Sequence, residues 1–108
     1  MALSTNTQSN AQGVINFAVG QVVTDSATAA AATFTLGFAP RHIKFVNATD
    51  RIIDEWFEGM ASASSIHTVA AGTNTLETTN GIAVSGNTFT LTATTMVASK
   101  TFYYIAQG

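Results

Sequence analysis

Asp54 and Glu58 flank Trp56, the arrangement in this sequence that comes closest to catalytic chemistry. A pair of carboxyl groups is typical of glycosidases, which hold them about 5–5.5 Å or 6.5–9.5 Å apart, and a tryptophan could serve as the sugar platform. On a strand, residues four apart lie about 13 Å from each other, too far for either arrangement. On a helix they would be neighbours but exposed. The pattern therefore favours a polar edge or an interface rim over a catalytic pair.

His42 and His67 are the only histidines and hence the candidate metal ligands or general bases. A zinc site takes three or four protein ligands, and no carboxylate or second histidine lies at a helpful spacing from either residue. Ser64-Ser65-Ile66-His67 lacks the glycines of a nucleophile elbow. Gly72 and Gly81 are isolated turn glycines that do not lead into the Lys-Ser or Lys-Thr of a phosphate-binding loop. We predict no catalytic residue, no metal site and no cofactor.

Charged residues are scarce: four Lys and Arg and six Asp and Glu, for a net charge of −2. Four basic residues cannot form the stripe that nucleic-acid binding needs. No apolar run approaches the ~18 residues of a membrane span, and residues 1–12 lack the basic start and apolar stretch of a secretory signal. There is no cysteine for disulfides or thiolate ligands. We expect synthesis in the cytoplasm and neither a nucleic-acid nor a membrane partner.

Apolar residues alternate with polar ones in several short segments, which predicts strands. The alternation is seen in residues 14–23 and again in residues 34–38, before Pro40 ends the segment. Residues 41–47 and 100–106 are two further apolar segments. The 18 threonines fit this interpretation because a branched Cβ packs well on a pleated sheet.

Gly86-Asn87 is a two-residue hairpin turn of the type with glycine first. The turn fixes a register in which Val84 faces Phe89 and Ile82 faces Leu91. All four apolar side chains then fall on one face, which we expect to be buried.

Residues 50–60 fit two structures. Their apolar positions have helical spacing, with Asp50 as a possible cap and Gly59 as a possible stop. As a strand, the segment would place Ile52 and Trp56 on one face and Ile53 and Phe57 on the other, both buried. We favour the strand because the neighbouring segments are β-rich.

These elements predict an all-β protein with a single domain, a β-sandwich or small barrel of about seven short strands, over residues 14–108. Residues 1–13 are largely polar, uncharged and without periodicity through residue 12, which predicts a flexible N-terminal arm that either frays or orders on a partner. Since only ten charges cover the chain, an isolated subunit must expose weakly polar surface. We therefore expect a homo-oligomer, with a closed ring of three copies as the first expectation.

Several strand and turn segments resemble those of small structural proteins of tailed bacteriophages. The similarity covers roughly residues 34–108, and the segments that carry it are Leu36–Asn47, Thr49–Asp50, Glu55–Met60, Asn80–Ile82, the Gly86-Asn87 turn and the final Tyr103–Gly108. The resemblance implies a β-sandwich-like capsid decoration (cement) protein, or another minor virion component, that binds the shell as an oligomer. It carries over no catalytic residue and does not separate head from tail.

From this we expect a non-enzymatic protein of the virion that stabilises a phage head by contacts with its own copies and with the major capsid protein. The residues predicted to form the interface are those of the charged stretch: Arg41, Lys44, Arg51, Asp54, Trp56 and Glu58. The alternative function is a carbohydrate-binding module of a tail or fibre. In that case Trp56, Tyr103 and Tyr104 would be the stacking platforms.

Overall fold

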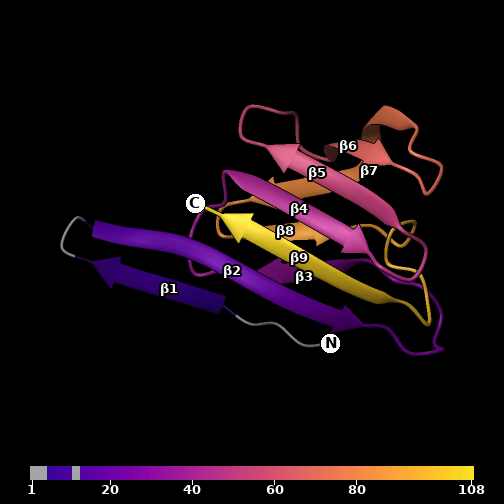
Figure 1. The fold of residues 1–108 in the computed structure, drawn as a ribbon, viewed down its shortest axis with the longest axis horizontal. Coiled ribbons are helices and arrows are strands. Elements are labelled where there is room, and N and C mark those ends of the chain that lie inside the picture. Colours follow the sequence, from indigo (N-terminus) through magenta and orange to yellow (C-terminus); the bar gives the residue numbers. More distant parts are fainter. Residues whose placement is uncertain (1–4, 11–12) are drawn as a thin grey trace.

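The computed structural model describes residues 5–10 and 13–108, which form nine strands and no helix (Figure 1). The strands are β1 (Thr5–Asn10), β2 (Gly13–Val23), β3 (Ala32–Thr35), β4 (His42–Asn47), β5 (Ile52–Phe57), β6 (Ser64–Thr68), β7 (Asn74–Ser85), β8 (Thr88–Leu91) and β9 (Thr101–Gln107). Every pairing between them is antiparallel. The predicted all-β class is confirmed, with nine strands instead of about seven.

The strands follow one another in the order β1-β2-β9-β4-β5-β6-β7-β8-β3. The long strand β7 connects the two parts of this sheet. Its first residues, 74–77, pair with β6, and residues 83–85 pair with β8. The sheet thereby curls into a half-barrel in which β3 and β8 lie behind β2, β9 and β4 (Figure 1). The core fills the space between these two layers.

Residues 5–10 of the predicted N-terminal arm form β1, which pairs with β2 in a register that places Thr5 opposite Ala18. The sequence did not predict this strand because its residues are uniformly polar and show no alternation. Residues 1–4 and 11–12 of the predicted arm lie outside the described residues. The predicted domain boundary at residue 14 falls one residue after the start of β2.

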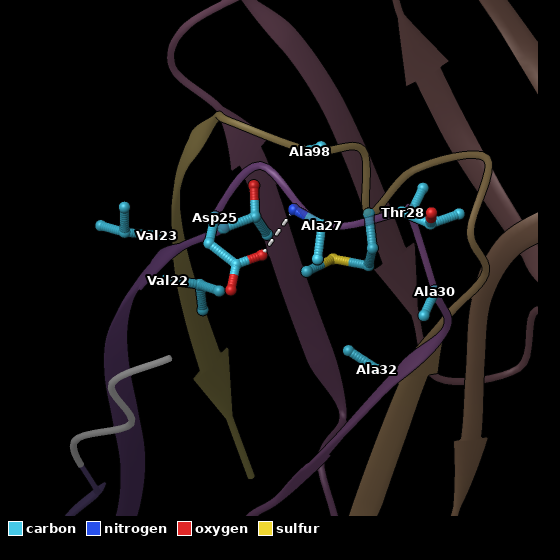
Figure 2. Close-up of a pocket in the computed structure, with 11 residues that line it drawn as sticks. Val22, Val23, Asp25, Ala27, Thr28, Ala30, Ala32 and Ala98 are labelled. Atoms are coloured by element: carbon cyan, nitrogen blue, oxygen red, sulfur yellow. Dashed lines mark hydrogen bonds between the residues drawn. The ribbon is translucent and has the colours of Figure 1, made fainter.

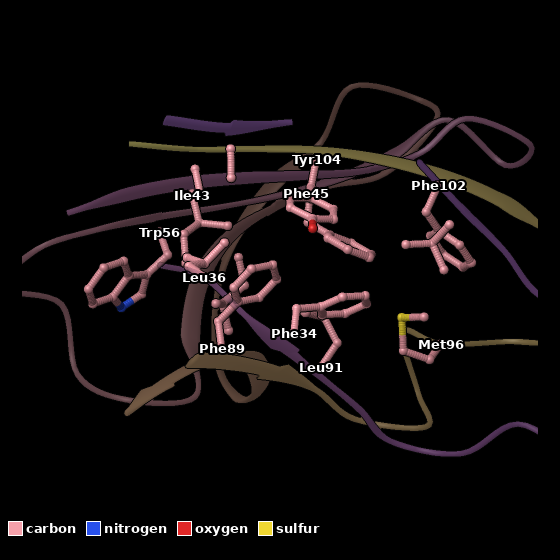
Figure 3. Packing of buried hydrophobic residues seen from close by; sticks show 14 of the residues in the cluster. Phe34, Leu36, Ile43, Phe45, Trp56, Phe89, Leu91, Met96, Phe102 and Tyr104 are labelled. Atoms are coloured by element: carbon pink, nitrogen blue, oxygen red, sulfur yellow. The ribbon is translucent and has the colours of Figure 1, made fainter. Parts of the chain in front are cut away.

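Aromatic rings from both layers meet at the centre of the core (Figure 3). Phe34 of β3 stacks on Phe89 of β8, with ring centroids 5.0 Å apart. Phe34 also approaches Phe45 of β4 and Tyr104 of β9, at 5.7 Å and 5.4 Å. Such ring pairs add about 0.5–1.5 kcal/mol each beyond the burial of their area.

The predicted hairpin is present in its predicted register, with Val84 opposite Phe89. Gly86 has φ 57°, as a glycine-first turn requires. Ile82, Phe89 and Leu91 are fully buried, and Val84 is half-buried against the same core. The turn type and the apolar alternation therefore predict the same inward face of the hairpin, and this face packs on the core.

Residues 52–57 form β5, so the preference for a strand in residues 50–60 is confirmed. Its inward face buries Trp56 and Asp54. The expectation that both faces are buried is wrong, because Phe57 on the other face is 47% exposed. No layer covers that face of the sheet within the described part of the chain.

Candidate interaction surface

The predicted interface residues divide into an exposed group and a buried group. Arg41, Lys44, Arg51 and Glu58 are exposed. Arg41 Nε lies 3.1 Å from Glu58 Oε1, and both side chains are more than half exposed. Such an ion pair contributes little to stability, at most about 1 kcal/mol, which suits the rim of an interface.

Asp54 and Trp56 do not belong to a surface, because they are 2% and 6% exposed. Their strand turns both side chains toward the core, between the two layers. A buried side chain cannot reach a partner, so the structure removes both residues from the predicted interface. The sequence pattern could not reveal this because a buried Asp is rare unless paired, and its partners come from another strand.

Asp54 accepts two hydrogen bonds on the same oxygen, Oδ1. Ser65 Oγ donates one at 2.8 Å, and His67 Nδ1 lies 2.9 Å away. The three residue types are those of a hydrolytic triad, but the connections differ. In a triad the serine bonds to the histidine, which can then take its proton. Here Ser65 is fully buried and its hydroxyl bonds to the carboxylate, so the cluster ties β5 to β6.

The second histidine also binds a carboxylate across strands. His42 Nε2 lies 2.7 Å from Glu55 Oε2, and His42 Nδ1 lies 3.2 Å from Gln107 Oε1. In both His–carboxylate pairs the partners are 13 residues apart, and strand pairing brings them together. Local spacing in the sequence could not reveal these pairs, because the two partners of each pair lie on different strands.

A cavity of about 190 Å³ opens beside the Asp54 cluster. Its polar lining includes Asp50, Asp54, His67, Glu77 and Asn80. The hydrogen bond from Lys100 Nζ, 3.2 Å from Oδ1, is the main cause that lowers the pKa of Asp50.

Backbone N–H groups of Asn80 and Thr79 donate to Glu77 Oε2, both at 3.1 Å, and lower the pKa of that carboxyl group. The carboxylates of the cavity are thus engaged by the chain itself. The described residues contain no group of three or more His, Asp and Glu arranged to hold a metal ion.

Another hollow, of about 240 Å³, lies under the loop that follows β2 (Figure 2). Most of its lining is small and apolar, including Val22, Ala27, Ala30 and Met96. The carboxylate of Asp25 accepts a hydrogen bond of 2.9 Å from the Ala27 N–H and so shapes the loop. This hollow offers little polar chemistry.

Exposed apolar side chains gather on one face of the molecule, which we call the outer face. It is the side of β2, β9, β4, β5, β6 and β7 that points away from the core. Seven large apolar side chains are exposed among the residues with described side chains, and six of them lie on this face: Val19, Val23, Phe57, Ile66, Leu76 and Tyr103. Only Val69 lies elsewhere, after the end of β6. An apolar concentration of this kind is typical of an interaction surface.

Strand register arranges the outer face in rows that run across the strands. The central row is Val19, Ile105, Lys44, Glu55, Ile66 and Leu76. The adjacent row is Gln21, Tyr103, Val46, Ile53, Thr68 and Asn74. Of the predicted interface residues, Lys44 therefore sits at the middle of the outer face.

Comparison with known proteins places the chain in no family: no family model matches it, and neither does any curated protein or solved structure. The described part of the chain contains no helix that is long and apolar enough to cross a membrane.

Proposed function

We propose that this protein is a non-enzymatic structural protein of a phage virion, a capsid decoration protein that stabilises the head by repeated protein–protein contact. Its partners are its own copies and the major capsid protein, and its place is the virion, after synthesis in the host cytoplasm. The observation that carries the proposal is the outer face, where six of the seven large apolar side chains found exposed in residues 16–108 gather.

The composition supports the same function. A subunit with ten charged residues and a net charge of −2 carries little repulsion between copies, so repeated packing costs little electrostatic energy. The exposed Arg41–Glu58 pair lies beside Phe57, at the end of β5. There it acts as a polar rim, which contributes specificity more than affinity.

The alternative, carbohydrate binding on a tail or fibre, rested on three aromatic rings. Trp56 and Tyr104 are 6% and 2% exposed, and both belong to the core. Tyr103 alone is exposed, at 46%. A sugar platform built from these three rings therefore has no support in the structure.

The test uses particles of the encoding phage from which this gene has been deleted. Purified protein is added, and its binding is measured by co-sedimentation and by cryo-electron microscopy. We expect density repeated over the whole head and a raised temperature of head disruption. Failure to sediment with the particles would contradict the proposal, and density at the tail tip alone would favour the alternative.

A further inference from the structure

The central row of the outer face has two apolar residues at each end and two opposite charges at its centre. From β2 to β7 it runs apolar, apolar, Lys44, Glu55, apolar, apolar. The midpoint of the row lies between β4 and β5, where Lys44 and Glu55 are direct register partners. The lysine and the glutamate thus occupy the two positions nearest to the centre.

A two-fold axis parallel to the strands at this midpoint would make the row complementary to a second copy of itself. The axis exchanges the β4 side with the β5 side, so Lys44 meets Glu55 of the partner subunit. In the same way Ile105 lies opposite Ile66 of the partner subunit beside the axis, and Val19 and Leu76 are the matching apolar positions at the two ends of the row. An isologous interface requires this property, in which one patch is complementary to itself.

The adjacent row repeats the pattern without charges. Val46 and Ile53 form its apolar centre, Tyr103 and Thr68 follow with hydroxyl groups, and the amides of Gln21 and Asn74 lie at its ends. The same axis therefore pairs apolar with apolar and amide with amide. One two-fold axis therefore relates both neighbouring rows to their copies.

The charges of the face favour a second copy over a strongly charged partner. Among the described residues, Lys44 makes no ion pair, although it is exposed beside Glu55. Glu55 bonds instead to His42. One lysine and one glutamate give these two rows no net charge. In a copy turned by the axis, Glu55 keeps the bond to its own His42 and still presents a carboxylate opposite Lys44.

We propose that the outer face is a two-fold homodimer interface centred between Lys44 and Glu55. The proposal rests on the proposed function in taking this face as the adhesive surface, and it names a second copy of the chain as its occupant. It replaces the ring of three copies expected from composition with a pair. The longer dimensions of the molecule, 43 Å and 28 Å, leave room for the roughly 800 Å² per partner of a standard interface.

The test is a charge exchange followed by light scattering over a dilution series. The unmodified protein is expected to be a dimer that dissociates on dilution. Lys44→Glu places two carboxylates against each other twice per dimer and should raise the dissociation constant by at least about tenfold. The double variant Lys44→Glu/Glu55→Lys restores opposite charges with an unchanged net charge, and it should recover most of the association.

Two apolar variants provide a matched control. Ile66→Ser removes an exposed side chain of the central row next to Glu55 and should weaken the dimer. Val69→Ser removes an exposed side chain outside the outer face and should leave it unchanged. Circular dichroism confirms that each variant is folded.

A protein that is monomeric at every concentration would overturn the dimer, as would a dimer or trimer that Lys44→Glu leaves intact. Failure of the double variant to recover association would overturn the position of the two-fold axis between Lys44 and Glu55. Binding of a monomeric protein to phage heads would overturn the dimer and leave the decoration function standing. Dimers that do not bind heads would contradict the decoration function and leave the dimer standing.

Discussion

Gly20 and Tyr104 are register partners across β2 and β9, and the tyrosine ring covers the glycine. A Cβ at position 20 would lie 2.2 Å from Tyr104 Cε1 and 2.6 Å from its hydroxyl oxygen. The ring continues into the core, where it contacts Phe34, Phe45 and Phe89. Position 20 thus needs glycine for space, and the aromatic centre of the core depends on it.

Gly20→Ala should lower the free energy of unfolding by about 1–3 kcal/mol, the usual cost of inserting a methyl group into a filled core. Urea denaturation measures the change. In a Tyr104→Leu background the same alanine should cost much less, because the shorter side chain leaves the space open. Equal costs in the two backgrounds would mean that the tyrosine ring is not the obstacle.

Tyr104→Phe should leave the protein equally stable or raise its stability by about 1 kcal/mol. The hydroxyl group is buried and, within the described residues, lacks a hydrogen-bond partner, so its removal relieves an uncompensated desolvation cost. Thermal unfolding at neutral pH measures the effect. A clear loss of stability would reveal a partner for this hydroxyl group.

The pH dependence of the same variant gives an independent check. Burial raises the pKa of Tyr104 to about 12 from the ordinary value of 10. Because burial disfavours the phenolate, the folded protein holds this proton more tightly than the unfolded chain does, and the free energy of unfolding falls as the pH rises from about 10 toward 12. Tyr104→Phe should therefore lose less stability above pH 10 than the unmodified protein does.

Local sequence chemistry was enough to predict the strand class and one hairpin. In residues 82–91 the alternation and the Gly86 turn agree, and the register follows from them. Over residues 50–60 the helical and extended patterns compete, and the neighbouring strands decide the outcome. The polar strand β1 has no apolar alternation and forms through pairing with β2.

The candidate surface was less accessible to sequence reasoning, because a face of a sheet combines residues from distant strands. Lys44 was predicted as part of a charged stretch, but its neighbours on the outer face come from β9 and β5. Asp54 was assigned to the same stretch although its strand turns it inward to Ser65 and His67. Charge clustering along the chain therefore mixed an exposed residue with a buried one.

Phe89→Ala and Thr90→Ala test the two faces of β8. Phe89 is fully buried among aromatic rings, and its truncation should cost about 3–5 kcal/mol. Thr90 is half-buried and its hydroxyl lies 2.8 Å from that of Thr33, so its loss should cost under about 1 kcal/mol. Chemical denaturation compares the two variants, and similar costs would contradict the assignment of faces.

Glu77→Gln should reduce the acid sensitivity of the fold. The pairing of β6 with β7 shifts register at residues 78–81, which have no partner in β6. In this segment Glu77 Oε2 accepts hydrogen bonds from the N–H groups of Thr79 and Asn80. These bonds favour the ionised carboxylate and hold its pKa below 4.5. A group with a lowered folded pKa contributes its stability above the unfolded value and loses it as the pH falls through the folded one.

Melting temperatures measured from neutral pH down to about pH 3 would show the effect, since this range includes the ordinary carboxyl values. The glutamine can still accept hydrogen bonds through its amide oxygen but does not titrate, so its curve should fall less steeply below pH 4.5. Asp50→Asn is the matched variant, because the pKa of Asp50 is also lowered, chiefly by Lys100. Asp50→Asn should make the melting temperature fall less steeply in the acid range where the carboxyl group of Asp50 takes up its proton. If the curve of Glu77→Gln runs parallel to that of the unmodified protein, the carboxylate does not support this turn through its charge.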